Sequence, residues 1–194
     1  MEKKPSVRRL KEMKEVVYNK EFARSNPELQ LYEVYRNLKK DGDLRYDVTI
    51  TKPALLGDEL TRTKGNCNSH GFQELYTVLE GEGIFLLQKF DGKKVKDVFA
   101  VKARAGDWVI VPPYYWVVMI NSSPDEALET GNWVSDKTDN LYQALEEIGG
   151  QCYFYTRNGW VRNKNYDEVP ELRMESPLKK KPESLDFLRT GIEK

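Results

Sequence analysis

The sequence has few cysteines and no excess of charge of either sign. Only Cys67 and Cys152 occur among its 194 residues, which is too few for the disulfide framework of a small secreted protein. Lysine and arginine together number 31, and so do aspartate and glutamate. Balanced charge gives no electrostatic field that would favour nucleic acid or a membrane surface. We therefore expect neither kind of partner.

Long apolar runs are also absent. No stretch approaches the roughly 20 apolar residues that a transmembrane helix needs. The charged N-terminus, MEKKPSVRRLKEMKEVV, has no apolar segment of the kind found in signal peptides. The length is that of one domain with room for a sizeable core. We expect a single-domain protein of the cytoplasm.

What the chain does contain is a series of short strand patterns. In Arg45–Lys52 polar and apolar residues alternate, which is typical of a half-buried strand and places Thr49 on the opposite face from Val48. Further strands are expected at Glu74–Leu79, Ile84–Phe90, Val95–Ala103, Trp108–Val111, Trp116–Ile120 and Leu128–Ser135. Gly81-Glu82-Gly83 and Asp91-Gly92 resemble hairpin turns. Many short strands without intervening helices predict an all-β sandwich or barrel.

Helical patterns are few and short. Weak ones lie near Val7–Val17 and Glu28–Leu38, where the apolar face is thin. A better one covers residues 139–148, with Asn140 as a candidate cap and Gly149-Gly150 as a stop signal. We expect the first two to belong to a strap around a barrel, and the third to be the main helix of the chain.

The end of the chain changes in composition. A hairpin pattern covers residues 151–162, and a lysine- and proline-rich tail that we expect to be loosely ordered begins at Glu171, with a short helix near Ser184–Leu188. The chain is thus divided into an N-terminal strap with edge elements over 1–44, a barrel over 45–170 and a C-terminal tail over 171–194.

Two glycine-marked motifs lie within the strand region. In the first, Glu74 is followed after six residues by Gly81; in the second, Gly106 is followed after five residues by Pro112, and the motif ends at Asn121. This spacing resembles the two motifs of cupins, in which an HxH pair, a glutamate and a third histidine hold one metal ion. The resemblance implies a double-stranded β-helix, or jelly-roll, barrel with a pocket inside it.

Several short segments point to one family of cupins. They are SVRRL at Ser6–Leu10, LYEVY at Leu31–Tyr35, GDL at Gly42–Leu44, TKG at Thr63–Gly65, ELYTVLEGEG at Glu74–Gly83 and VPPYYW at Val111–Trp116. In this order they resemble the archaeal-type (cupin) glucose-6-phosphate isomerases. The family implies a homodimer that interconverts glucose 6-phosphate and fructose 6-phosphate, in glycolysis and gluconeogenesis, with the help of a divalent metal.

The resemblance also implies roles for individual residues. The family's phosphate-binding positions correspond to Tyr32, Thr49, Thr63 and Gly65. Glu74 and Tyr76 match its glutamate and the tyrosine two residues on, and would be catalytic. Tyr142 matches a later substrate-binding tyrosine, whereas Trp133 stands in place of a further tyrosine.

The metal-binding histidines of the family are missing. Their positions hold Asn66, Asn68 and Val117, so only Glu74 remains of the ligand set. Amide oxygens are weak donors to a transition metal and valine cannot bind one, so we expect no metal cofactor. Asparagine N–H groups and Glu74 would then have to support any isomerisation. His70, the only histidine, is either a displaced ligand or an ordinary loop residue.

The sequence leaves the function open between two classes. One is an isomerase whose activity is weak and independent of metal; the other is a non-catalytic cupin that binds a sugar phosphate, or another small ligand, as a sensor or partner protein. A different metal-free reaction at the apolar wall around Val117 is a third possibility. The aromatic residues Tyr114, Tyr115, Trp116, Trp133 and Tyr142 either floor a sugar site or belong to the core or a dimer contact.

Overall fold

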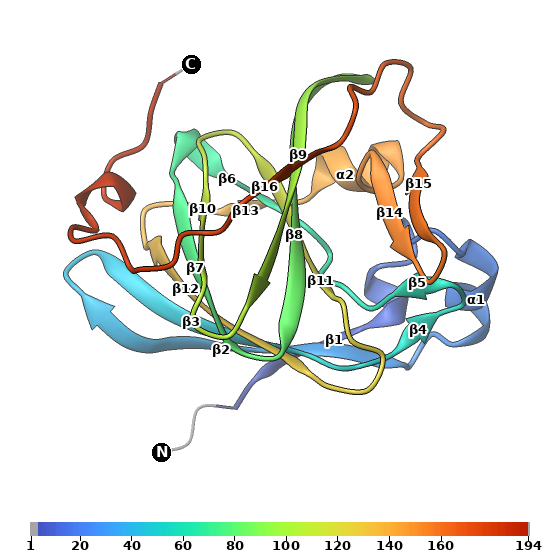
Figure 1. The fold of residues 1–194 in the computed structure, drawn as a ribbon, viewed down its shortest axis with the longest axis horizontal. Helices are drawn as coiled ribbons and strands as arrows, with labels where there is room; N and C mark the ends of the chain where they lie inside the picture. Colours follow the sequence, from blue (N-terminus) through green and yellow to red (C-terminus); the bar gives the residue numbers. More distant parts are fainter. Residues whose placement is uncertain (1–3, 194) are drawn as a thin grey trace.

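Two β-sheets face each other in the structure, a computed structural model that describes residues 4–193 (Figure 1). The larger sheet has the strand order β1-β2-β3-β12-β7-β10. The bounds of its strands are Ser6–Arg9 for β1, Gln30–Asp41 for β2, Leu44–Thr51 for β3, Leu128–Ser135 for β12, Glu74–Glu80 for β7 and Trp108–Val111 for β10.

The second sheet has the order β11-β8-β9-β16. Its strands are β11 (Trp116–Asn121), β8 (Glu82–Asp91), β9 (Lys94–Arg104) and β16 (Arg173–Glu175). Two small sheets pair β6 (Cys67–Asn68) with β13 (Asn140–Leu141), and join β4 (Leu55–Leu56), β5 (Glu59–Leu60), β14 (Tyr153–Thr156) and β15 (Gly159–Arg162). The helical elements are α1 (Lys20–Ser25), α2 (Gln143–Ile148), η1 (Leu10–Glu12), η2 (Ser69–Gly71) and η3 (Asp186–Leu188). The expected all-β fold with a few short helices is confirmed.

The strands predicted by alternation are all present, and β10 and β12 have the predicted bounds. One turn was predicted wrongly. Asp91-Gly92 does join the antiparallel pair β8 and β9, but Gly81 carries the chain from the larger sheet into the second sheet and forms no hairpin. Gly81 has φ +78°, and a Cβ there would lie 2.5 Å from the carbonyl oxygen of Ala127, so the corner requires glycine.

The helix predicted near Glu28–Leu38 is wrong, because this segment lies in β2 and pairs with β3. Its aromatic and β-branched residues suit a strand, and sheet pairing decides the outcome over a weak helical pattern. The segment near Val7–Val17 forms β1, η1 and turns. Its apolar side chains, except the exposed Val7, are fully buried with Leu31 and Leu145, so the start of the chain closes one end of the barrel.

The predicted helix at 139–148 begins later than expected, as α2. Its N-cap is Tyr142, whose side chain makes no capping hydrogen bond, and it ends at Gly149 with φ +84°. Asn140 is not the cap: it lies in β13, opposite Asn68 of β6. This pairing moves Asn140 toward the interior of the barrel.

The C-terminal tail is better ordered than the composition indicates. It contributes β16, which pairs in parallel with β9 and so covers an edge of the second sheet. Lys179 Nζ lies 2.8 Å from Asp107 Oδ1, and Arg189 Nη1 lies 2.7 Å from Asp43 Oδ1, which fastens the tail to the barrel. No helix within residues 4–193 is long and apolar enough to cross a membrane.

Candidate ligand-binding pocket

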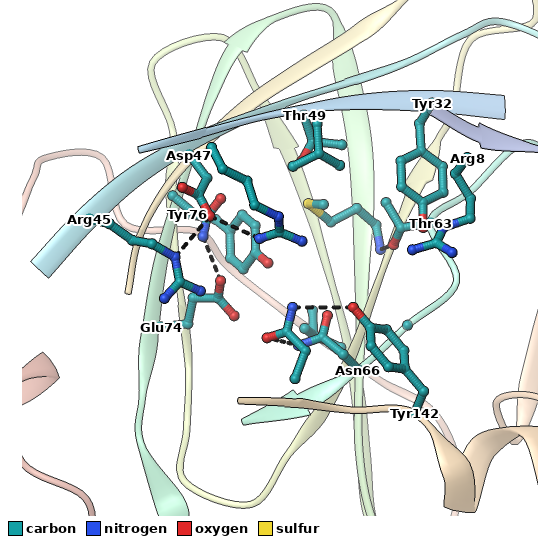
Figure 2. A pocket seen from close by; sticks show the side chains of 17 residues that line it. Arg8, Tyr32, Arg45, Asp47, Thr49, Thr63, Asn66, Glu74, Tyr76 and Tyr142 are labelled. Atoms are coloured by element: carbon teal, nitrogen blue, oxygen red, sulfur yellow. Dashed lines mark hydrogen bonds and ion pairs between the residues drawn. The ribbon is translucent and has the colours of Figure 1, made fainter. Parts of the chain in front are cut away.

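One pocket opens into the barrel between the larger sheet and β11 (Figure 2). Its lining residues are Arg8, Tyr32, Val34, Arg36, Arg45, Asp47, Thr49, Thr63, Gly65, Asn66, Glu74, Tyr76, Val117, Met119, Asn132, Asn140 and Tyr142. Of the predicted site positions, all but Asn68 line it. Asn68 is buried beside the pocket and donates a hydrogen bond from Nδ2 to Glu74 Oε2 at 3.4 Å. The structure therefore brings the predicted site residues together.

Strand alternation determines which side chains reach the pocket. On β3, Arg45, Asp47 and Thr49 lie on one face, and all three line the pocket. On β7 the same rule brings Glu74 and Tyr76 inward. The face of Thr49 was predicted, and the same alternation would have identified Arg45 and Asp47, which were overlooked.

Tyr32, Thr49, Thr63 and Gly65 form what we call the hydroxyl end of the pocket. The Tyr32 hydroxyl accepts a hydrogen bond from the backbone N–H of Lys64 at 3.3 Å. Thr63 Oγ1 accepts one from the backbone N–H of Met119 at 3.0 Å, so each hydroxyl keeps its own proton to donate. These groups can donate to an anion without carrying charge themselves.

Gly65 brings backbone close to the hydroxyl end. It has φ +89°, and a Cβ there would lie 2.6 Å from Val118 Cγ2. Both the backbone angle and the close approach exclude a side chain. Lys64 lies between Thr63 and Gly65, and strand alternation predicts that its side chain points away from the pocket. Its Nζ lies 2.5 Å from Glu146 Oε1.

Arg8 adds a positive charge at the hydroxyl end, and sequence reasoning missed it. Arg8 of β1 lies directly opposite Tyr32 of β2 in the sheet register. Figure 2 shows its guanidinium next to Thr63 and Tyr32. The SVRRL segment that contains it was recognised as part of the family pattern, but only the pairing of β1 with β2 reveals that its side chain reaches the pocket.

Glu74, Asn132, Asp47 and Arg45 form the opposite, carboxylate end of the pocket. Glu74 is only 4% exposed, and its Oε1 accepts a hydrogen bond from Asn132 Nδ2 at 2.6 Å. Asn132 was not predicted; it lies on β12 directly opposite Tyr76 of β7, a pairing that the local pattern does not reveal.

Burial raises the pKa of Glu74 to about 7, and the hydrogen bond from Tyr76 and the nearby Arg45 oppose this rise while the charge of Asp47 adds to it. Burial also raises the pKa of Tyr76, with the carboxylate of Glu74 as the next cause. Glu74 therefore changes its protonation state near neutral pH, as a general base or acid must.

Asp47 is buried at the same end and accepts three hydrogen bonds. Its Oδ2 receives Arg36 Nη1 at 3.1 Å and Arg45 Nε at 3.2 Å, and its Oδ1 receives the backbone N–H of Asn37 at 2.8 Å. Two guanidinium groups thus share one carboxylate. The ion pairs fix Arg45 close to Glu74 (Figure 2).

Of the aromatic cluster, only Tyr142 lines the pocket. Trp133 packs on Tyr46, Tyr115 on Phe99, and Trp116 on Phe90, with ring centroids 5.0, 5.7 and 5.5 Å apart. A sugar floor made of these rings is therefore wrong.

Asparagines connect Tyr142 to the pocket wall. Asn66 Nδ2 donates to Asn140 Oδ1 at 3.4 Å, and Asn140 Nδ2 donates to the Tyr142 hydroxyl at 3.2 Å. The hydroxyl proton of Tyr142 remains available to a ligand.

The side chains of Asn66, Asn68 and Val117 do not fit a transition metal. Both carboxylate oxygens of Glu74 already accept amide N–H donors, from Asn68 and Asn132, which leaves fewer lone pairs for a metal. Val117 offers no donor atom. Within residues 4–193, no three His, Cys, Asp or Glu side chains gather to hold a metal. His70 is exposed and lies outside the pocket, because β6 ends at Asn68 and the chain turns into η2.

The sequence matches known proteins over most of its length. The family model of glucose-6-phosphate isomerase (GPI) matches residues 7–171. Over 179 residues the chain is 35% identical to the glucose-6-phosphate isomerase of Thermococcus litoralis, covering 88% of this chain and 89% of that protein. It is 31% identical over 167 residues to that of Thermococcus onnurineus (strain NA1), covering 82% and 84%.

The solved structures that this chain resembles are more distant. The cupin domain of Schizosaccharomyces pombe Cnp3 has a TM-score of 0.39 and 12% identity, over 62% of this chain and 72% of that one. Oxalate oxidase in complex with glycolate has a TM-score of 0.45 and 13% identity, over 57% and 54%.

Proposed function

The chain belongs to the glucose-6-phosphate isomerase family, and from this premise we propose that it binds glucose 6-phosphate and fructose 6-phosphate and interconverts them slowly without a metal ion. The observation that carries the proposal is that the hydroxyl end and the buried Glu74 line the same pocket. One end suits a phosphate, and the other holds a carboxyl group whose pKa suits proton transfer.

The hydroxyl end is the proposed phosphate site. Thr49 and Thr63 offer hydroxyl donors, Gly65 offers backbone, and Arg8 offers positive charge. Hydrogen bonds to a charged group contribute roughly 1.5–3 kcal/mol each, so a few of them suffice for specific binding. The phosphate therefore orients the sugar with its first two carbons toward the carboxylate end.

Glu74 is the proposed base. Its carboxylate removes the proton from carbon 2 of the open-chain aldose, and that electron pair forms the double bond of an enediol. Glu74 then returns the proton to carbon 1, while the hydroxyl proton moves from oxygen 2 to oxygen 1, so the atoms balance. Asn66 and the Tyr142 hydroxyl supply hydrogen bonds to these oxygens.

The rate is expected to be low because neutral donors replace a cation. Removing a single donor to a developing oxyanion costs about 10²–10³ in rate in well-studied enzymes, so such donors help. A metal acting as a Lewis acid stabilises several kcal/mol of developing charge. The proposed reaction uses no metal ion, because Asn66, Asn68 and Val117 do not fit one.

A second candidate function is binding without turnover. The observation that favours it is that both oxygens of Glu74 are engaged by Asn132 and Asn68, while Val117 and Met119 make the adjacent wall apolar. In that case the protein would bind a sugar phosphate as a sensor or partner protein. Binding alone would then survive where catalysis does not.

A coupled assay separates the two functions. Fructose 6-phosphate is supplied to protein purified from a host strain that lacks its own glucose-6-phosphate isomerase, and the glucose 6-phosphate formed is followed through its dehydrogenase. We expect a slow rate that a chelator leaves unchanged and that Glu74→Gln abolishes. A fast rate lost on chelation would contradict metal independence, and no rate together with tight binding would select the second function.

The assembly and location implied by the family stay predictions. We propose a homodimer in the cytoplasm, with a sugar phosphate as its small-molecule ligand. Analytical ultracentrifugation tests the dimer, and a sedimentation coefficient of a 22.6 kDa monomer would contradict it.

A further inference from the structure

The carboxylate end contains a positively charged side chain, Arg45, that has no role in the proposed phosphate site. Arg45 lies on the same face of β3 as Thr49, four residues away, and both line the pocket. Four residues of strand span roughly 13 Å, which is comparable with an extended six-carbon sugar and its phosphate. A ligand whose phosphate is bound near Thr49 would therefore present its first carbon near Arg45.

The guanidinium of Arg45 is held in place, yet it keeps donors for a ligand. Nε donates to Asp47 at 3.2 Å, and Nη1 donates to the backbone carbonyl of Ser135 at 3.1 Å. Nη2 has no hydrogen-bond partner among residues 4–193. The side chain is 14% exposed, so it is fixed but still reachable from the pocket. Figure 2 shows it beside Glu74 and away from Arg8.

Arg45 is only partly neutralised by its partners. Asp47 also accepts hydrogen bonds from Arg36 and Asn37, so it does not serve Arg45 alone. Two further acidic groups lie near Arg45. Asp136 has its Oδ1 3.6 Å from Nη1 of Arg45 and also pairs with Lys40, and Glu74 is the second. Arginine stays protonated at any physiological pH, and its planar fork suits a carboxylate or an enediolate.

We propose that Arg45 binds negative charge on the oxygen of the ligand's first carbon. This inference deepens the proposed function and rests on it, since it requires the phosphate at the hydroxyl end. Arg45 would be a specificity-determining residue for ligands with an anionic first carbon, and would stabilise the same charge as it develops during isomerisation.

Two probes that differ only at the first carbon test the proposal. In 6-phosphogluconate this carbon is a carboxylate, and in glucitol 6-phosphate it carries a neutral hydroxyl. Both are titrated calorimetrically at pH 6, below the raised pKa of Glu74, so that this carboxyl group is mostly neutral. We expect 6-phosphogluconate to bind about tenfold more tightly, the contribution of one charge-assisted hydrogen bond. The ratio of the two affinities is the readout.

Matched variants locate the effect. Arg45→Met is expected to bring the ratio to about one, whereas Arg45→Lys, which keeps the charge, should retain part of the preference for 6-phosphogluconate. Arg8→Met at the other end should weaken both probes equally and leave the ratio as in the wild type. Unfolding curves verify that each variant folds.

The outcomes separate this inference from the proposed function. A wild-type ratio near one, or a ratio that survives Arg45→Met, overturns the role of Arg45 and leaves the phosphate site intact. If Arg45→Met does not fold, the wild-type ratio and Arg45→Lys still decide. Failure of both probes to bind the wild-type protein would overturn the phosphate site, and the inference with it.

Discussion

The two ends of the pocket differ in what they share with the family and in how they carry charge. The hydroxyl end contains the residues that the family resemblance predicts to bind phosphate, and Arg8 lies beside them. The carboxylate end keeps Glu74 but surrounds it with asparagine amides and the Arg45–Asp47 ion pair. In the proposed function, binding of the anionic end of a ligand and chemistry at its other end would therefore depend on separate groups.

Glu74→Gln should produce the largest difference between the ends. Loss of a general base lowers turnover by about 10²–10⁴-fold. The affinity for glucitol 6-phosphate should stay unchanged, because the hydroxyl end is untouched. The coupled assay and calorimetry measure the two effects, with Glu80→Gln, at the exposed end of β7, as the control. Equal losses of binding and turnover in Glu74→Gln would contradict the claim that the two ends of the pocket act through separate groups.

The change in the free energy of unfolding with pH tests the carboxylate end, because it should depend on Glu74. Burial raises its pKa from the usual 4.5 to about 7, so the folded protein holds the proton more tightly than the unfolded chain does. The stabilisation is complete below pH 4.5 and is lost as the pH rises through 7, by about 3 kcal/mol in all. Urea unfolding from pH 4 to 8 should show this loss in the wild type and not in Glu74→Gln. Parallel curves for the two proteins would refute it.

Thr49→Val tests the hydroxyl end. The change removes one hydroxyl at nearly constant shape, and should weaken binding of both 6-phosphogluconate and glucitol 6-phosphate by about 10- to 100-fold. Thr51→Val is the matched control, since Thr51 is buried two residues along β3 and does not line the pocket. An unchanged affinity in Thr49→Val would remove Thr49 from the phosphate site.

Gly65→Ala leaves the pocket's hydroxyl groups in place and tests why backbone lies at the hydroxyl end. Gly65 and Gly106 both have φ +89°, but only at Gly65 would a Cβ meet another atom, Val118 Cγ2 at 2.6 Å. Both alanine variants carry the same backbone strain. The difference between their free energies of unfolding therefore measures the steric overlap of the new Cβ with Val118. We expect Gly65→Ala to lower the free energy of unfolding by about 1–3 kcal/mol more than Gly106→Ala does. If thermal unfolding shows equal losses of stability in the two variants, Val118 moves aside at no cost in free energy, and the prediction fails.

The sequence predicts the strands and much of the pocket because alternation and motif spacing are local signals. The face of Thr49 follows from the period of β3 alone. The helix expected at Glu28–Leu38 fails because its apolar residues fit either period, and only pairing with β3 selects the strand. Local patterns therefore reveal an element more reliably than they reveal its partner.

The residues that sequence reasoning missed are those whose position depends on a partner strand. Arg8 reaches the pocket because β1 pairs with β2, and Asn132 reaches Glu74 because β12 pairs with β7. Arg45 is a different case. Alternation along the sequence places it on the same face as Thr49, but a charged side chain inside a barrel is not expected until its ion pair with Asp47 is known.

Titration of glucose 6-phosphate into protein dialysed against a chelator tests the central claim most directly. The proposed function predicts that the pocket binds the phosphorylated sugar without any metal, does not bind glucose under the same conditions, and gains no affinity when Mn²⁺ is added. Binding that appears only after Mn²⁺ is restored, or equal binding of glucose and glucose 6-phosphate, would contradict it.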